Sequence, residues 1–300
     1  IDLGIGYNPT AIVTLGDIAR LRNQPEQATQ QYNAALEQNP DQGSAYIGLG
    51  RLAADAGNWS VAAAHFQRGI VHESGSAEAH YWLAQALVEQ GDINNAISEY
   101  RQALGLRPEY AEAYYGLAMA QLRSSQVEQR EQARSNIELA LLIRPDYAEA
   151  WLEKGKLEEA AGRDQAALDA YSQAISSNGR LAEPRYQRAR LYIRQDQMSD
   201  AERDLEMAIR ARPNFPEAHY WLGRVYQAQN RQQLAREEFG LAVAQRDGNF
   251  PDARFYQGIA EEQLGLRDAA LESFRVALEQ SDSSPWASDA RAALARLGSQ

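Results

Sequence analysis

Small and large apolar residues recur along this chain at spacings of four and three, which places them on one face of a helix. Each run is a small residue, a large apolar residue four positions on, and another small residue three further. The eight runs begin at Ala28, Ala62, Ala96, Ala133, Ala167, Ala201, Ala235 and Ala270. Turn residues such as Gly57-Asn58 and Gly91-Asp92 precede the runs, and a second helical pattern precedes the turns. The pattern predicts an all-α chain built from units of helix, short turn, helix.

The units follow a period of 34 residues. The six residues from Glu78 (EAHYWL) return unchanged at Glu217, four periods and three residues later. The three extra residues fall between Arg123 and Glu131, where they predict either one more helical turn or a knob that faces a partner. The predicted copies are residues 9–42, 43–76, 77–110, 111–147, 148–181, 182–215, 216–250 and 251–284.

This pattern resembles the tetratricopeptide repeat family over nearly the whole chain. The third copy carries the family's positions as His80, Leu83, Ala84, Leu87, Ala96, Tyr100, Ala103 and Pro108. The closing proline departs from the family pattern in copies two, five, seven and eight, and Lys154 stands where copy five should carry leucine. The resemblance implies an α-solenoid in which stacked helix pairs form a right-handed superhelix.

The two ends of the chain differ. Residues 1–8 contain Gly4 and Gly6 and are expected to form a loose segment, and a start at Ile1 is expected of a processed or truncated chain. Residues 285–298 predict a capping helix, with Ser284 as its N-cap and an apolar stripe for copy eight. The stripe consists of Trp286, Ala290, Ala293, Leu294 and Leu297.

Composition narrows the class of protein. Of 300 residues, 30 are Lys or Arg and 41 are Asp or Glu, a net charge of −11 that disfavours nucleic-acid binding. With no cysteine, the chain has no disulfide, thiolate metal site or cysteine nucleophile. No apolar run reaches the roughly 18 residues of a membrane span. All but two cations are arginine, which favours a bacterial protein of the cytoplasm or the cell envelope.

In the family that this chain resembles, the first helix of each copy lines a concave groove. Carried over to this sequence, the expected partner-binding residues combine aromatic side chains with cations at one equivalent position. They are Arg51, Tyr81, Trp82, Tyr115, Met119, Lys156, Tyr186, Arg190, Tyr220, Trp221, Arg224, Phe255 and Tyr256. Other positions expected on this face are Val13, Asp17, Ile47, Gln85, Leu122, Leu152 and Arg194.

Two interpretations of these residues stay open. Tyr, Trp and Arg are the side chains that anchor interfaces, so they favour a groove for an acidic extended peptide or a partner helix. Alternatively, the aromatic rings pack between successive copies and the arginines pair with the glutamate at each helix start. A clamp for a C-terminal carboxylate is not expected, because Asp17 and Gly48 stand where asparagine would be needed.

Catalytic patterns are missing from the sequence. Gly48-Leu49-Gly50 resembles part of a dinucleotide fingerprint but lies inside a predicted helix with no preceding strand. The four histidines are His65, His72, His80 and His219, and none has a partner at zinc-ligand spacing. We therefore expect a non-catalytic scaffold without metal or cofactor that binds a protein or peptide, as in bacterial envelope or membrane-associated complexes. The alternative is the recognition domain of a larger enzyme, such as a transferase.

Overall fold

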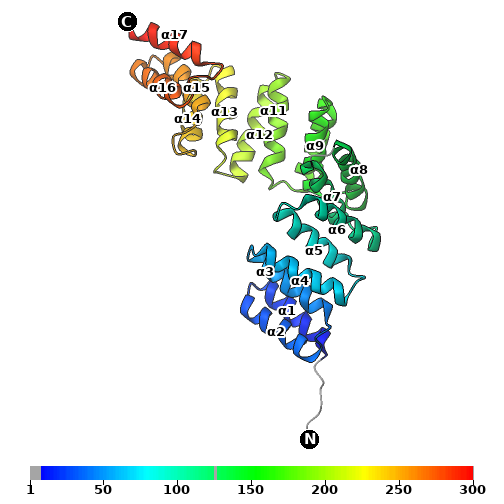
Figure 1. The fold of residues 1–300 in the computed structure, drawn as a ribbon. Coiled ribbons are helices and arrows are strands. Elements are labelled where there is room, and N and C mark those ends of the chain that lie inside the picture. The colour runs from blue at the N-terminus through cyan, green and yellow to red at the C-terminus, as the bar shows by residue number, and fades with distance from the viewer. Residues whose placement is uncertain (1–7, 125–126, 300) are drawn as a thin grey trace. The chain divides into compact units, whose positions relative to one another are not determined.

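The computed structural model describes residues 8–124 and 127–299, and this part of the chain contains seventeen helices and no strand (Figure 1). The prediction of an all-α fold is confirmed. The helices are α1 (Pro9–Leu21), α2 (Pro25–Gln38), α3 (Gly43–Asp55), α4 (Trp59–His72), α5 (Ala77–Glu89), α6 (Ile93–Leu106), α7 (Ala111–Arg123), α8 (Val127–Ile143), α9 (Ala148–Ala160), α10 (Asp164–Ser177), α11 (Ala182–Arg194), α12 (Met198–Ala211), α13 (Pro216–Ala228), α14 (Gln232–Ala244), α15 (Pro251–Gln263), α16 (Arg267–Gln280) and α17 (Ala287–Gly298).

The chain divides into two compact units, Ile1–Ala150 and Trp151–Gln300, each of which we describe by itself. Within each unit, consecutive helices pack as pairs, for example α3 with α4 and α13 with α14, and each pair packs on the next. A stack of helix pairs is an α-solenoid. The repeat boundaries stay predictions, and the loose segment expected at residues 1–8 lies outside the described residues except for Asn8, the N-cap of α1.

Small residues let the two helices of a pair approach closely around a buried ring. The side chain of Tyr32 is fully buried, as are Ala28 and Ala35 beside it on α2. A Cβ atom at Gly16 would lie 2.5 Å from Cε1 of Tyr32, and one at Gly48 would lie 2.3 Å from the same atom. The Tyr32 ring therefore fills space that side chains on α1 and α3 leave open, which explains the spacing of small and large residues in the sequence.

The turn within a pair needs a left-handed residue. At the end of α3, Gly57 has a φ of +75° and the amide of Asn58 donates to the carbonyl of Ala53 at 2.8 Å. This pattern closes the helix by satisfying its last carbonyls. The equivalent position is not always glycine, since Asp196 and Asn230 occupy it with a φ of 59° each.

The three extra residues of the fourth copy lengthen its second helix. Helix α8 has 17 residues, whereas α6 and α10 have 14 each. The structure thus agrees with the interpretation as an additional helical turn. Residues 125 and 126, in the turn itself, lie outside the described part of the chain.

The final helix covers the end of the second unit. Trp286 stacks on Phe255 with ring centroids 4.9 Å apart, and its indole Nε1 donates to Asp252 at 2.8 Å. Trp286, Ala290, Ala293 and Leu297 are buried as the apolar stripe predicts. The predicted N-cap is wrong, because α17 begins at Ala287 and no side chain caps it. The anchoring of the Trp286 ring places a turn before the helix, and the Ser284 hydroxyl lies 2.7 Å from that of Ser281 instead.

Candidate functional site

Predicted binding residues on α13 and α15 form one contact group in the second unit. The guanidinium carbon of Arg224 lies 3.9 Å from the ring centroid of Tyr256, and Nη1 of Arg224 donates to the Tyr220 hydroxyl at 3.2 Å. The rings of Tyr220 and Tyr256 are 6.0 Å apart. All three side chains are half-buried. The two rings therefore hold the Arg224 guanidinium in place while part of it stays accessible.

A second group connects α11 to α13. Arg190 lies 5.8 Å from the ring of Tyr186, and its Nη1 donates to Gln187 at 2.8 Å. Tyr186 is hydrogen-bonded to Trp221 and lies 4.9 Å, ring to ring, from Phe215. We call the half-buried residues of these two groups the α11–α15 surface; they are Tyr186, Arg190, Tyr220, Trp221, Arg224 and Tyr256.

Two phenols of this surface, those of Tyr186 and Tyr220, are held in the neutral form. Burial raises the pKa of both Tyr186 and Tyr220 above the usual value for tyrosine. A neutral phenol both donates and accepts hydrogen bonds. The surface thus offers neutral polar groups and two guanidinium charges.

The predicted cations differ in how far they are neutralised. Lys156 pairs with Glu153 at 2.8 Å, and Arg51 pairs with Glu78 at 3.0 Å. Arg190 and Arg224, by contrast, form no ion pair within 4 Å with any residue that the structure describes. Arg190 does interact electrostatically with Glu159, and the two residues line one cavity.

In the first unit, the contacts of Arg51 match the alternative interpretation. Oε1 of Glu78, at the start of α5, accepts from Arg51 and also from Nε1 of Trp82 at 3.3 Å. Trp82 packs between copies, 6.4 Å from the ring of Phe66, whereas Tyr81 packs within copy three against Tyr110 and Tyr100. These contacts stabilise the stack of repeats and leave no free charge at Arg51.

Tyr115 and Met119 line a cavity of about 230 Å³ between α5 and α7. The rest of its wall includes Gln85, Glu89, Tyr100 and Arg123. Tyr115 also packs against Tyr147, with ring centroids 5.0 Å apart. The structure thus brings these two predicted residues together, at a shallow site whose neighbours are mostly neutral.

Several positions expected on the first-helix surface are buried in the core. Phe255 is 4% exposed, and Val13, Ile47 and Leu152 are 5, 7 and 9% exposed. The expectation that Phe255 faces a partner is wrong, because its ring is sandwiched by the stacking of Trp286 and by Phe274 at 5.8 Å. In copy eight the adjacent aromatic residues therefore differ, with Phe255 in the core and Tyr256 half-buried, whereas both members of the pairs Tyr81-Trp82 and Tyr220-Trp221 are half-buried.

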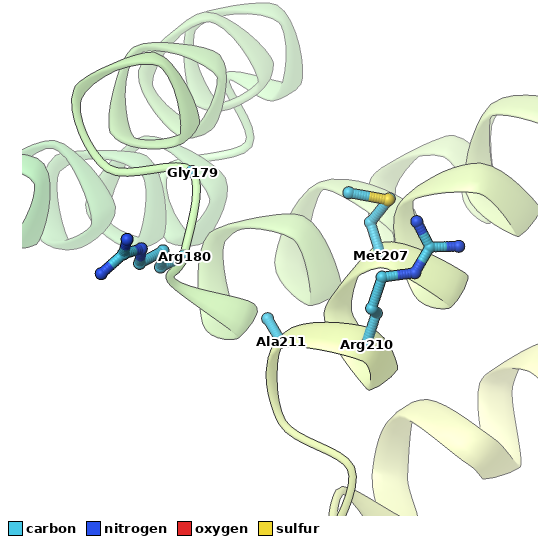
Figure 2. Close-up of a pocket in the computed structure, with 5 residues that line it drawn as sticks. All are labelled: Gly179, Arg180, Met207, Arg210 and Ala211. Carbon is cyan, nitrogen blue, oxygen red and sulfur yellow. The ribbon is translucent and has the colours of Figure 1, made fainter.

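Two other cavities lie in the second unit. One, of about 650 Å³, has Lys156, Glu159, Asp164, Arg190 and Arg194 in its lining, and Arg194 pairs with Glu159 at 2.7 Å and Asp164 at 3.1 Å. The other, of about 300 Å³, lies beside Met207 (Figure 2). Figure 2 shows the side chain of Arg180 pointing away from Met207, so its charge does not converge on that cavity.

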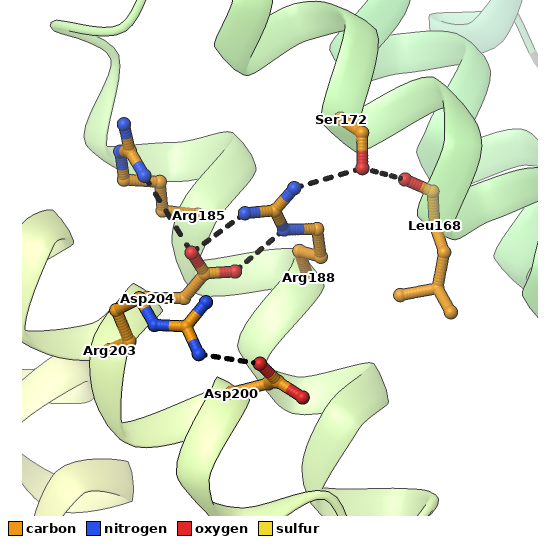
Figure 3. A network of polar contacts seen from close by, with 7 residues as sticks. All are labelled: Leu168, Ser172, Arg185, Arg188, Asp200, Arg203 and Asp204. Atoms are coloured by element: carbon orange, nitrogen blue, oxygen red, sulfur yellow. Dashed lines mark hydrogen bonds and ion pairs between the residues drawn. The ribbon is translucent and has the colours of Figure 1, made fainter.

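A buried ion pair that the sequence analysis missed joins α11 to α12 (Figure 3). Asp204 is 3% exposed and accepts two hydrogen bonds from Arg188, at 2.6 and 2.8 Å. Arg188 also donates to Ser172 at 2.9 Å, and Arg185 lies 3.6 Å from Asp204. The Asp204 carboxylate and the Arg188 guanidinium are thus paired within the group, which supports the register of the stack.

The described residues hold no group of three or more side chains suited to bind a metal ion. His80 and His219, at equivalent positions, each contact a glutamate at 2.6 Å, Glu99 and Glu238 respectively. These pairs are packing contacts between the two helices of a copy. Within the part of the chain that the structure covers, no helix is both long and apolar enough to cross a membrane.

The fold and this surface define a helical repeat protein whose first helices present aromatic and cationic side chains. Comparison with known families agrees. A family model described as tetratricopeptide repeat matches residues 13–78, 48–96, 125–182, 186–250 and 241–285, and one described as TPR repeat matches residues 84–124. The chain belongs to the tetratricopeptide repeat family, whose fold is a scaffold for protein interaction.

Solved structures show the same fold. The structure titled "Functional Characterization of Pseudomonas Aeruginosa pilF" has a TM-score of 0.65 and 20% identity, and covers 74% of this chain and 97% of its own. The structure of the Cut9–Hcn1 heterotetramer of APC/C has a TM-score of 0.60 and 13% identity, and covers 98% of this chain and 57% of its own. No curated protein shows a significant match.

Proposed function

We propose that this chain is a non-catalytic scaffold that binds an acidic, extended segment of a partner protein on the α11–α15 surface. The observation that carries the proposal is the state of Arg190 and Arg224. Each guanidinium is oriented by an aromatic ring and a neutral hydrogen-bond partner, and neither forms an ion pair with a carboxylate of the described residues.

An arginine in this state favours a carboxylate ligand. Hydrogen bonds between guanidinium and carboxylate are charge-assisted and often bidentate. Because the rings already fix the arginine side chains, binding loses less conformational entropy than it would with mobile ones. Tyr186, Tyr220 and Tyr256 add apolar area next to each charge, and tyrosine and arginine are the residues enriched at binding hot spots.

The remaining predicted residues take a smaller part in this proposal. Trp221 supports Tyr186, and Lys156 and Arg51 are occupied by Glu153 and Glu78. Tyr115 and Met119 are proposed as a separate, neutral contact in the first unit. A place in a bacterial envelope or membrane-associated complex stays a prediction from the sequence.

Selection from a random library of displayed ten-residue peptides tests the proposal. The wild-type chain is expected to enrich peptides containing Asp and Glu, and the double variant Arg190→Gln/Arg224→Gln is expected to lose this preference. Arg275→Gln is the matched control, because Arg275 is an exposed arginine on α16 that pairs with Glu272.

The affinity of a synthetic acidic peptide from that selection gives the second measurement. We expect a loss of at least about tenfold in the double variant, and weaker binding to wild type at higher salt. Circular dichroism checks that helicity is unchanged. Enrichment without acidic residues, or equal affinity for wild type and the double variant, would refute the proposed surface.

A further inference from the structure

The outer face of α1 is apolar and open. Leu15, Ile18 and Leu21 are 50, 41 and 75% exposed. The exposed residues of this helix are Thr10, Ala11, Thr14, Leu15, Ile18 and Leu21, and none of them carries a charge. Ala11, Leu15 and Ile18 are spaced by four and three, so they share one stripe of the helix.

The same two positions are half-buried in copy two and buried in copies three, four and seven. One period on, Leu15 corresponds to Leu49 and then to Leu83, and Ile18 corresponds to Leu52 and then to Ala86. Leu83 and Ala86 are 4 and 0% exposed. In α7 and α13 the equivalent residues are also buried; they are Leu117, Ala120, Leu222 and Val225. Exposure at α1 therefore comes from the lack of a covering helix, since none precedes α1 within the described residues.

In each of these later copies the cover is the second helix of the preceding pair. Leu83 and Ala86 of α5 lie in one apolar cluster with Ala62 and Phe66 of α4. Leu117 and Ala120 of α7 lie in one cluster with residues of α6, and Leu222 and Val225 of α13 in one with residues of α12. The covering face is thus a small residue, a large apolar residue four positions on, and a small residue three further.

We propose that α1 docks an amphipathic helix of a partner protein in the place that a preceding second helix takes at later copies. The docking face of the partner carries the small–large–small pattern and no charge, which matches the uncharged stripe on α1. Beside the stripe lies a hollow of about 120 Å³ between α1 and α2, with Leu15, Ile18, Arg22, Gln27 and Gln31 in its lining. The hollow accepts a side chain of the incoming helix.

A second copy of this chain does not supply that face. The first small residue of the pattern is fully buried in every second helix of the described residues, from Ala28 of α2 to Ala270 of α16. At the other end, α17 covers α16, and its exposed residues include Ser288, Asp289, Arg291 and Arg296. The described residues of a second copy therefore offer no free helix face with this pattern.

A peptide with the sequence of residues 92–107 is a suitable probe, because it contains α6 and its N-cap Asp92. Isolated helices of this length are marginal in water, so the peptide is stapled between positions 98 and 102, both exposed in α6. Fluorescence anisotropy is expected to show saturable binding to the full chain. The peptide variant Ala96→Glu/Tyr100→Glu is expected not to bind.

Variants of the chain locate the site. Leu15→Glu/Ile18→Glu is expected to weaken peptide binding at least tenfold, and the partial exposure of both side chains lets the variant keep its helicity. Leu142→Glu is the matched control, since Leu142 is a 77% exposed leucine on α8, and it is expected to bind as wild type does. Equal binding by the double variant overturns the proposal.

A fusion in cis covers the case in which the free peptide binds too weakly to measure. Residues 92–110 are joined directly to Pro9, which copies the natural connection from α6 to α7. Hydrogen exchange in α1 is expected to slow in the fusion and not in its Leu15→Glu/Ile18→Glu variant. The proposal is overturned if hydrogen exchange in α1 is not slowed in the fusion. It is also overturned if the chain forms concentration-dependent dimers that the double variant abolishes. The outcome is independent of the acidic-peptide test, because that surface lies on α11, α13 and α15.

Discussion

Gly48 is the residue on which the fit of α3 against Tyr32 depends. A Cβ there would lie 2.3 Å from Cε1 and 2.5 Å from Cζ of the ring. The ring has no free direction to move in, because it is fully buried and its hydroxyl donates to Asp17 at 2.8 Å. We expect Gly48→Ala to lower the free energy of unfolding by about 1–3 kcal/mol, since overpacking outweighs the better helix propensity of alanine.

Gly105→Ala is the matched control for this substitution. Gly105 lies in α6 with no atom within 4 Å of its Cβ position, so alanine adds only helix propensity and stabilises by up to about 1 kcal/mol. Urea denaturation of both variants measures whether each substitution lowers or raises the free energy of unfolding. If Gly48→Ala were as stable as Gly105→Ala, the ring would not limit the approach of α1 and α3.

Residue patterns predict the solenoid core well and its surface less well. The small–large–small runs and the glycine turns depend on local spacing, so they were readable at Ala28, Tyr32 and Gly57. The sequence does not show whether Arg51 and Arg224 are neutralised. Neutralisation depends on which carboxylate from a neighbouring copy reaches each guanidinium. The exposure of Leu15 and Ile18 was missed as well, although their position in the first copy could have indicated it.

At the scale of elements, α17 is the cover of the last pair. Its main anchor is Trp286, which is 6% exposed, stacks on Phe255 and donates to Asp252. Arg267 of α16 adds hydrogen bonds to the carbonyl of Leu297 at the other end of α17. The stability of a repeat protein is nearly the sum of the stabilities of its copies and of the interfaces between neighbouring copies. Loss of the α17 contacts should therefore destabilise mainly the helices next to it.

We expect Trp286→Ala to detach α17 from α15 and α16 and to lower the free energy of unfolding of this end of the stack by about 3–5 kcal/mol. Amide exchange in α15 and α16 should accelerate, whereas exchange in α11 and α12 should stay near wild type. Ser288→Ala, an exposed substitution on α17, serves as the control. Equal acceleration in all helices of the second unit would mean that the cap stabilises the unit as a whole.

At the scale of the whole molecule, each of the two units has buried tyrosines in its own core. Burial, the largest cause, raises the pKa of Tyr147 and of Tyr226 to about 12. Burial also raises the pKa of Tyr32, Tyr100 and Tyr171, and hydrogen bonds to Asp17 and Glu159 act in the same direction for the first and last of these. In the unfolded chain these phenols ionise near pH 10.

These shifts predict alkaline unfolding. Because the folded pKa is higher than the unfolded one, the stability that the neutral phenols contribute is complete below about pH 10 and is lost as pH rises toward 12. A titration that follows phenolate absorbance and helical circular dichroism together tests this. We expect the buried phenolates to appear with the loss of helix, above the pH at which exposed tyrosines ionise. Full ionisation near pH 10 with helicity intact would show that solvent reaches the rings in the folded state, contrary to the packing around Tyr32 and its equivalents.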